Sequence, residues 1–340
     1  MANVANKGTF ASYNGASLNE IFYEPVFRSD EIMRNYRVIP NVKHKMNVYT
    51  SAALTKIVEK QENCSSTSGT VQFNVDNKTI TAGRCRVALE QCSDEFYGTY
   101  IEEMYRSGVD VNNIEGTQLA DAIVNRAVTG IASDVVRLAW GADTDITTPA
   151  ATAAAYNLMD GWMKLMAAET VIEYAGTEAA PTAADAIGLI RNVYDQAPAA
   201  LQQVAAGDKK MFVTPKIFNA YLANLEASAN ATADLAIVNQ QEGIRRVMFR
   251  GVELVPMYEW DTILADYNPA LFTTAAATNV SNGVCYCAVE NLIIGSDVTD
   301  PEGSFKVFYD DLEEKMFFRG YFKLGVQYLY SSLVQWGIVA

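Results

Sequence analysis

The longest regular hydrophobic pattern in the chain has the period of an α-helix. After Gly116, apolar residues recur every three or four positions and form one stripe. The stripe consists of Leu119, Ile123, Ala127, Ile131, Val135 and Leu138. It predicts an amphipathic helix with Thr117 as N-cap and Gly141 just past its end. At 1.5 Å per residue, this helix is roughly 30–35 Å long.

Residues 47–89 are rich in strand signals, and two stretches within them alternate between apolar and polar side chains, as strands with one buried face do. The alternating apolar positions are Val71, Phe73, Val75, Cys85, Val87 and Leu89. The segments CSSTSG and DNK contain turn-forming residues and separate the predicted strands. We therefore predict a long two-stranded hairpin that projects from the body. Because an isolated hairpin is marginally stable in water, it is expected to lie across a partner.

Helical and strand patterns alternate between residues 158 and 227. A short helix is predicted around Trp162, and Thr182 with Asp185 fits the capping pattern of a second helix. Residues 209–214 predict a strand that leads into a third helix, with Thr214 as cap and Pro215 as first helical residue.

Strand patterns dominate the rest of the chain. Arg250-Gly251 is the expected connection of a two-residue hairpin, and VCYCAVENLIIG predicts one strand that ends at Gly295. Residues 305–328 predict a strand, an acidic turn and a very long second strand. One face of that second strand carries Met316, Phe318, Phe322, Leu324, Val326 and Tyr328.

Charge and targeting patterns exclude several classes of protein. The 340 residues include 26 Lys and Arg against 40 Asp and Glu, so the formal net charge is −14. This charge repels phosphate backbones, so general nucleic-acid binding is not expected. Residues 1–20 lack the charged and apolar regions of a signal peptide and predict an extended arm held by a neighbouring subunit. Synthesis in the cytoplasm and no membrane segment are expected.

Catalytic and metal-binding motifs are not found in the sequence. His44 is the only histidine and lies between two lysines, so a triad or a Cys-His pair would have to use it. Adjacent carboxylates occur at 102–103, 310–311 and 313–314, a pattern typical of solvated surfaces. The five cysteines, Cys64, Cys85, Cys92, Cys285 and Cys287, are expected to be free thiols. We predict no catalytic residue, no metal site and no cofactor.

Basic residues gather on the predicted hairpin of an otherwise acidic chain. A solvated hairpin explains this pattern about as well as a docking surface does. If the hairpin docks on an acidic neighbour, complementary charge would set its register. The candidate interface residues are Lys56, Lys60, Phe73, Lys78, Arg84 and Arg86.

The order of these parts resembles the Hong Kong 97-type fold of tailed-phage major capsid proteins over nearly the whole chain. The segments KKMFVTPKIFNAYLANL, FRGVELVPM, ENLIIGSDV and FKLGVQYLY are similar to its strand-helix unit, following strand and closing region. The resemblance implies an α+β fold with an arm at 1–46 and an extended loop at 47–92. It implies a peripheral domain with a spine helix at 93–150 and an axial domain with a mixed sheet at 151–298. Residues 299–340 would return to the peripheral domain and end in a C-terminal strand.

The resemblance also implies a function. The chain would be a non-enzymatic subunit that self-assembles, as hexamers and pentamers, into the icosahedral shell around a tailed phage's double-stranded DNA. It would be found in the virion capsid, assemble in the host cytoplasm and enclose DNA without sequence-specific binding. Scaffolding, portal and decoration proteins, where present, would be separate chains.

Three other functions stay open at this point. An encapsulin-like nanocompartment shares the fold and houses protein cargo. A tail-tube subunit is disfavoured by the long helix, because tubes are mostly β-structure. An enzyme that uses acidic residues is the least expected alternative.

Overall fold

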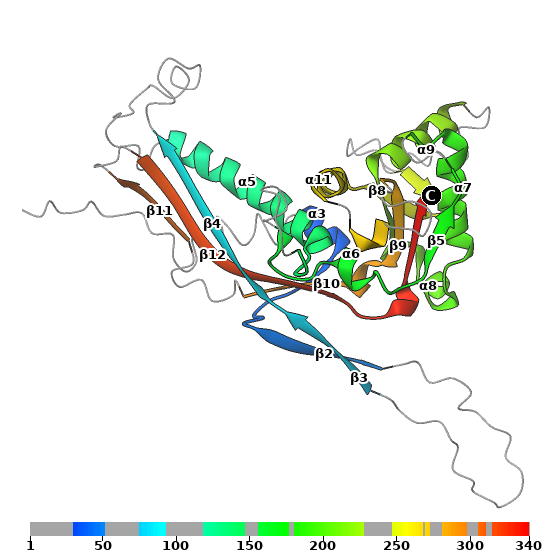
Figure 1. The fold of residues 1–340 in the computed structure, drawn as a ribbon, viewed down its shortest axis with the longest axis horizontal. Helices are drawn as coiled ribbons and strands as arrows, with labels where there is room; N and C mark the ends of the chain where they lie inside the picture. Colours follow the sequence, from blue (N-terminus) through cyan, green and yellow to red (C-terminus); the bar gives the residue numbers. More distant parts are fainter. Residues whose placement is uncertain are drawn as a thin grey trace, which may run out of the picture.

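The chain forms an elongated α+β molecule with a long sheet at one end and a wider, helix-covered sheet at the other (Figure 1). The structure, a computed structural model, describes residues 30–51, 75–92, 118–146, 156–176, 180–227, 247–267, 269–272, 281–297, 305–310 and 315–339. A two-stranded hairpin of β2 (Lys45–Ser51) and β3 (Val75–Thr81) extends away from both sheets.

The long end is a five-stranded sheet built on β12 (Lys315–Tyr328). One edge of β12 pairs with β4 (Gly83–Cys92) from Lys315 to Leu324. Its other edge pairs first with β11 (Phe305–Asp310) and then with β10 (Leu292–Ser296). Strand β1 (Arg37–Ile39) pairs with β10 in parallel. The predicted strand and the very long second strand are confirmed by β11 and β12, whereas the predicted acidic turn at 311–314 lies outside the described residues.

One face of this sheet packs against the long helix α5 (Gln118–Gly141). The predicted apolar face of β12 is confirmed at Phe318, Phe322, Leu324, Val326 and Tyr328, which are all buried in one cluster with residues of α5. The helix contributes Ile131, Val135 and Leu138 from its predicted stripe. The long helix itself is confirmed, whereas Thr117 lies outside the described residues.

Gly141 has a different role from the predicted one. It is the last residue of α5 and has no left-handed backbone conformation. A Cβ atom there would lie 2.8 Å from the side chain of Ile263 in α11 (Tyr258–Asp266). Glycine therefore allows α11 to approach the end of α5 closely.

The other end is a six-stranded mixed sheet with the order β5-β13-β9-β6-β8-β7. Its strands are β5 (Val171–Tyr174), β6 (Lys209–Val213), β7 (Val247–Phe249), β8 (Val252–Pro256), β9 (Gly283–Ala288) and β13 (Val334–Val339). Every residue of β6, β9 and β13 is buried. This explains their nearly continuous apolar sequences, because both faces of the sheet are covered.

Two helices cover one face of this sheet: α7 (Ala183–Asp195) and α9 (Pro215–Ala227). The predicted capping box of α7 is confirmed, since Thr182 and Asp185 each bond the other's backbone N–H. The predicted start of α9 at Pro215 is also confirmed. Thr214 precedes it, but its hydroxyl is buried and unpaired, so the predicted side-chain cap is wrong. The short helix α8 (Ala199–Gln203) follows α7.

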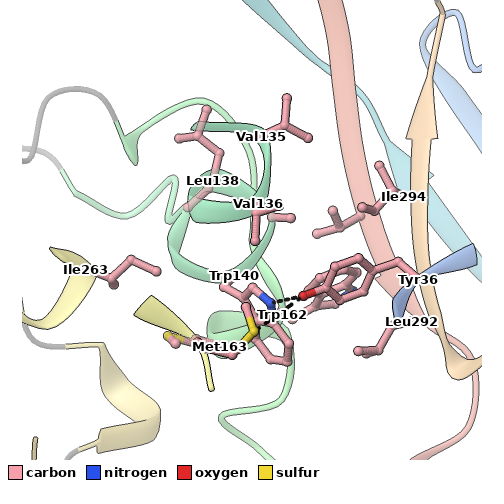
Figure 2. Packing of buried hydrophobic residues seen from close by; sticks show 14 of the residues in the cluster. Tyr36, Val135, Val136, Leu138, Trp140, Trp162, Met163, Ile263, Leu292 and Ile294 are labelled. Atoms are coloured by element: carbon pink, nitrogen blue, oxygen red, sulfur yellow. Dashed lines mark hydrogen bonds between the residues drawn. The ribbon is translucent and has the colours of Figure 1, made fainter. Parts of the chain in front are cut away.

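The opposite face of the six-stranded sheet contacts an aromatic cluster that also reaches α5 (Figure 2). All four tryptophans of the chain lie in it, one each from α5, α6 (Trp162–Leu165), α11 and β13. Trp140 packs edge-on at 4.9 Å, centroid to centroid, from both Trp162 and Trp260. Its indole N–H donates to the Tyr36 hydroxyl at 2.9 Å. One continuous core thus joins both sheets.

The segment before β1 is fastened to the six-stranded sheet. This segment contains helix α3 (Asp30–Asn35). The ammonium of Lys210, on β6, donates to the Arg34 carbonyl at 3.1 Å and to the Asn35 side chain at 2.7 Å, both in the last turn of the helix. Arg34 also forms an ion pair with Glu253 of β8. The buried ammonium of Lys210 therefore bonds to groups that replace water.

Two further predictions about strands have different outcomes. The hairpin around Arg250-Gly251 is confirmed by β7 and β8, and both connecting residues have positive φ (48° and 82°), as tight hairpin turns require. The single strand predicted for 284–295 is wrong. A 3₁₀ turn at Val289–Asn291 divides it into β9 and β10, which belong to different sheets.

Candidate interaction surfaces

The hairpin of β2 and β3 has one packed face and one uncovered face. Ile80 of β3 is buried with Val42, Ala82 and Ile293 in a small cluster at the hairpin's base. The opposite face carries Tyr49, 70% exposed, and Val75, 54% exposed. Because strand residues alternate between faces, this second face is directed away from the subunit. It therefore exposes apolar side chains to solvent in the isolated subunit.

A pair of glycines sets how closely the hairpin's base approaches the five-stranded sheet. Gly295 of β10 and Gly325 of β12 are opposite each other in the sheet register. A Cβ atom on Gly325 would lie 2.7 Å from the Thr81 carbonyl oxygen, and one on Gly295 would lie 3.0 Å from the Val42 side chain. Because neither glycine has a side chain, the segments just before β2 and just after β3 can cross the sheet closely at this point.

Lys78, a candidate interface residue, contacts its own subunit. It is half-buried in β3, and its ammonium lies 3.5 Å from the centroid of the Tyr328 ring. The Tyr328 hydroxyl donates to Glu169 at 2.7 Å. Burial lowers the pKa of Lys78, and the negative charge of Glu169 opposes this effect. Lys78 therefore connects the hairpin to the end of β12 by a cation–π contact.

Arg84 and Arg86 were predicted to lie on the hairpin with Lys78, and this prediction is wrong. Both lie on β4, which pairs along its whole length with β12. The predicted turn at DNK is also wrong, since these three residues belong to β3. Both arginines are exposed on the sheet face opposite α5. The remaining candidates, Lys56, Lys60 and Phe73, lie outside the described residues.

The groups considered for catalysis do not form a site in the described part of the chain. His44 is exposed beside the hairpin's base. The carboxylate pairs at 102–103 and 313–314 lie outside the described residues, as does Asp311. Cys85, Cys285 and Cys287 are free, buried thiols, as predicted, and burial raises the pKa of Cys85 to about 12. Among the described residues no group of acidic, His or Cys side chains could hold a metal ion.

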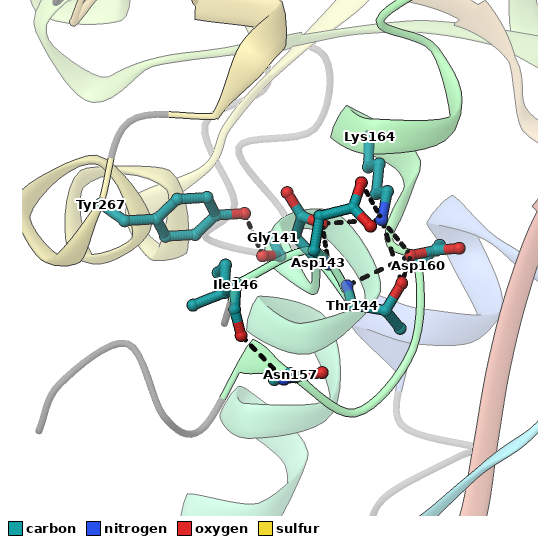
Figure 3. A network of polar contacts seen from close by, with 9 residues as sticks. Gly141, Asp143, Thr144, Ile146, Asn157, Asp160, Lys164 and Tyr267 are labelled. Carbon is teal, nitrogen blue, oxygen red and sulfur yellow. Dashed lines mark hydrogen bonds and ion pairs between the residues drawn. The ribbon is translucent and has the colours of Figure 1, made fainter. Parts of the chain in front are cut away.

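A network of ion pairs and hydrogen bonds surrounds Lys164 of α6 (Figure 3). Its ammonium lies 2.7 Å from Asp160, 2.8 Å from Asp143 and 3.0 Å from Asp145. The Thr144 hydroxyl also donates to Asp160 at 2.6 Å. Burial opposes ionisation of Asp160, but its bonds to Lys164 and Thr144 outweigh burial and lower its pKa. Lys164 lies between the three carboxylates. Because Asp143 and Asp145 directly follow α5, these ion pairs connect the end of α5 to α6.

No helix within the described ranges has the length and apolarity needed to cross a membrane.

Comparisons with known proteins give structural matches only. Neither a protein-family model nor a curated protein matches the sequence. A chain of the satellite phage P4 procapsid, solved with its size determination protein, is similar with a TM-score of 0.60 and 9% identity. The match covers 98% of this chain and 93% of that one. A chain of the capsid of an empty GTA particle has a TM-score of 0.51 and 10% identity, covering 93% and 90%.

These matches show the fold. The chain has the α+β fold of phage capsid proteins, and the predicted Hong Kong 97-like fold class is confirmed. Because both identities are low, residue roles do not transfer from these structures to individual positions here.

Proposed function

We propose that this chain is the major capsid subunit of a tailed phage and self-assembles into an icosahedral shell around double-stranded DNA. The observation that carries the proposal is the structural match to a procapsid chain over nearly the full length of both chains. The match covers 98% of this chain and 93% of that one, so the likeness includes both sheets and the hairpin. In this proposal copies form hexamers and pentamers, and the chain resides in the virion capsid.

The hairpin of β2 and β3 supports assembly through repeated contacts. Tyr49 and Val75 are exposed on a two-stranded ribbon, which is marginally stable when it lies alone in water. Covering this face with a neighbouring subunit would remove apolar surface from water and stabilise the ribbon. Lys56, Lys60 and Phe73, in the segment between the two strands, remain our predicted contacts on that neighbour.

Weak contacts that are repeated many times suit a closed shell. Each contact can open and re-form during assembly, while a completed shell holds every subunit through several contacts at once. The net charge of −14 per copy suits a DNA container, because an acidic wall does not bind phosphates. A strongly basic inner surface would contradict this part of the proposal.

Electron microscopy of the purified protein tests the function. We expect closed shells tens of nanometres across, and DNA inside shells taken from phage-producing cells. Tubes would support a tail protein instead, and enclosed enzymes would support a nanocompartment. A monodisperse species near 37 kDa under all assembly conditions would overturn the shell proposal.

A hairpin variant tests the proposed contact. Tyr49→Ser should slow assembly while leaving the fold unchanged, because Tyr49 makes little contact within its own subunit. Tyr258→Ser is the matched control, since Tyr258 is similarly exposed (67%) but lies on α11, far from the hairpin. Equal assembly rates for Tyr49→Ser and the unchanged protein would argue against hairpin docking.

A further inference from the structure

The outer face of the five-stranded sheet carries a cluster of cations that is unusual for so acidic a chain. Arg84 and Arg86 of β4 are exposed there, and β12 contributes Lys323 and Tyr321. In the sheet register Arg84 lies opposite Lys323, and Arg86 lies opposite Tyr321, which is 58% exposed. These four residues are called the basic stripe below. Figure 1 shows β4 and β12 side by side, with α5 along their other face.

The charges of the basic stripe are poorly balanced within the subunit. Like charges directly opposite each other on neighbouring strands are destabilising, and Arg84 and Lys323 are such a pair. Within the described ranges Lys323 has one carboxylate partner, Asp297, at 3.6 Å. Arg84 and Arg86 form no ion pair with any residue in the described ranges. The stripe is therefore suited to an anionic, partly apolar partner that also covers Tyr321.

The chain contains a segment of this chemistry. Strand β11 ends at Asp310 and β12 begins at Lys315, and the connection between them is Asp311-Leu312-Glu313-Glu314. Three of its four residues are acidic, and the fourth is leucine. Its carboxylates would complement the arginines, and Leu312 would complement the exposed ring of Tyr321.

A subunit cannot place this connection on its own basic stripe. Asp310 and Lys315, which flank the connection, are paired in the register of β11 and β12, so its four residues start and finish at that end of the sheet. Tyr321 and Lys323 follow Lys315 by six and eight residues along a continuous strand. At about 3.3 Å per residue they lie roughly 20–26 Å from the connection. Only a second copy can bring the two together.

We propose that, in the shell, the basic stripe of one subunit binds the acidic connection 311–314 of a second copy. This inference rests on the proposed function, and it names the partner and the charges of one contact. The contact is head-to-tail, because each copy offers the stripe to one neighbour and the connection to another. Its charges speed encounter and fix register more than they add affinity, and salt screens them.

Charge reversal at both partners tests the contact. Arg84→Glu with Arg86→Glu should raise the critical concentration for assembly at least ten-fold, and Glu313→Lys with Glu314→Lys should do the same. All four changes together should restore assembly to within about three-fold of the unchanged protein, because opposite charges meet again. Sedimentation velocity measures the assembled fraction, and circular dichroism confirms folding.

The control keeps the change in net charge the same. Arg191→Glu with Lys216→Glu alters two exposed cations on α7 and α9, at the other end of the molecule. This variant should assemble as the unchanged protein does. If it fails to the same degree as the stripe variant, net charge and not the stripe governs assembly.

Two further outcomes would overturn the proposed contact. Loss of assembly on reversal of the stripe but not of the connection would indicate another anion, such as nucleic-acid phosphate. If the variant with all four substitutions does not regain assembly, direct pairing of the stripe with the connection is excluded. If a variant does not fold, a salt titration of the unchanged protein decides: the critical concentration should rise with ionic strength, and a constant value overturns the contact. If the unchanged protein forms closed shells, the proposed function stays supported even when the proposed contact is refuted.

Discussion

Replacing Gly325 with alanine is expected to push the base of the hairpin away from the five-stranded sheet. The added Cβ atom would lie 2.7 Å from the Thr81 carbonyl oxygen and 3.1 Å from the Ala82 Cα atom. All three nearest atoms belong to the backbone, so no side chain can rotate to make room. An ordinary carbon–oxygen contact needs about 3.3 Å. The crossing segment must therefore move by roughly 0.6 Å.

The size of the effect follows from two opposing contributions. Overpacking of this kind costs about 1–3 kcal/mol. Alanine also restricts the unfolded chain, which stabilises the folded protein by about 0.4–1 kcal/mol. We therefore expect the free energy of unfolding of Gly325→Ala to fall by about 1–2 kcal/mol. Urea unfolding of unassembled subunits measures it, with tryptophan fluorescence as the probe because all four tryptophans lie in one core cluster.

A matched substitution separates crowding from the general effect of alanine. Gly130 lies in α5, and a Cβ atom there would meet nothing within 4 Å. Gly130→Ala should increase the free energy of unfolding by about 0.5–1 kcal/mol. Amide exchange at Ala82, whose N–H donates to the His44 carbonyl at 2.8 Å, should quicken only in Gly325→Ala. Equal stability gains in both variants, with unchanged exchange at Ala82, would refute the close crossing.

Three other substitutions test the core and its connections. Lys164→Met should destabilise the subunit by about 1–3 kcal/mol, because it leaves three carboxylates close together without their cation. Since the pKa of Asp160 is lowered in the folded state, its stabilising effect is complete above about pH 4, the usual pKa, and is lost as pH falls further. Acid unfolding curves should show this loss for the unchanged protein and a smaller one for Lys164→Met; parallel curves would contradict it. Gly251→Ala should cost about 1–2 kcal/mol in urea unfolding, because φ is +82° there; no loss would exclude a left-handed turn. Tyr36→Phe should cost about 1–3 kcal/mol by leaving the Trp140 indole N–H buried and unpaired, and an unchanged urea midpoint would count against that bond.

Local periodicity predicted the elements that bury one continuous face. The stripe ending at Leu138 and the alternation from Phe318 to Tyr328 each keep one period over many residues, and both elements are present. The Thr182–Asp185 capping box and the Arg250-Gly251 turn are also encoded within a few residues. Such features depend on neighbours in the sequence, so they can be predicted without knowledge of the partner elements.

Pairing between distant segments could not be predicted in the same way. The alternation of Cys85, Val87 and Leu89 correctly marks a strand, but it does not say which strand lies beside it. The partner is β12, more than 200 residues later, and not the other half of the hairpin. Arg84 and Arg86 were therefore placed on the wrong surface. The turn-forming residues at 76–78 were overridden by seven pairings between β2 and β3.

The change of sheet between β9 and β10 had a weak signal in the sequence. Asn291 interrupts an otherwise apolar run, and its side chain accepts bonds from the Leu329 and Tyr330 N–H groups. It thereby fixes the turn that sends the chain from one sheet to the other. The glycines at 295 and 325 had a comparable signal, since glycine within a strand often marks a close approach of another backbone.

The arrangement of the core separates stability from assembly. The tryptophan cluster joins the two sheets through α5, α6, α11 and β13, whereas the uncovered hairpin face and the basic stripe lie outside this core. Docking at either surface needs no change in the core, because the residues that would touch a neighbour are already exposed. Substitutions at Tyr49 or Arg86 should therefore alter assembly with little change in the free energy of unfolding, and Tyr36→Phe should do the reverse. If the chain forms the proposed shell, a subunit built this way can bind and release neighbours repeatedly while it stays folded, so misplaced contacts can be corrected before the shell closes.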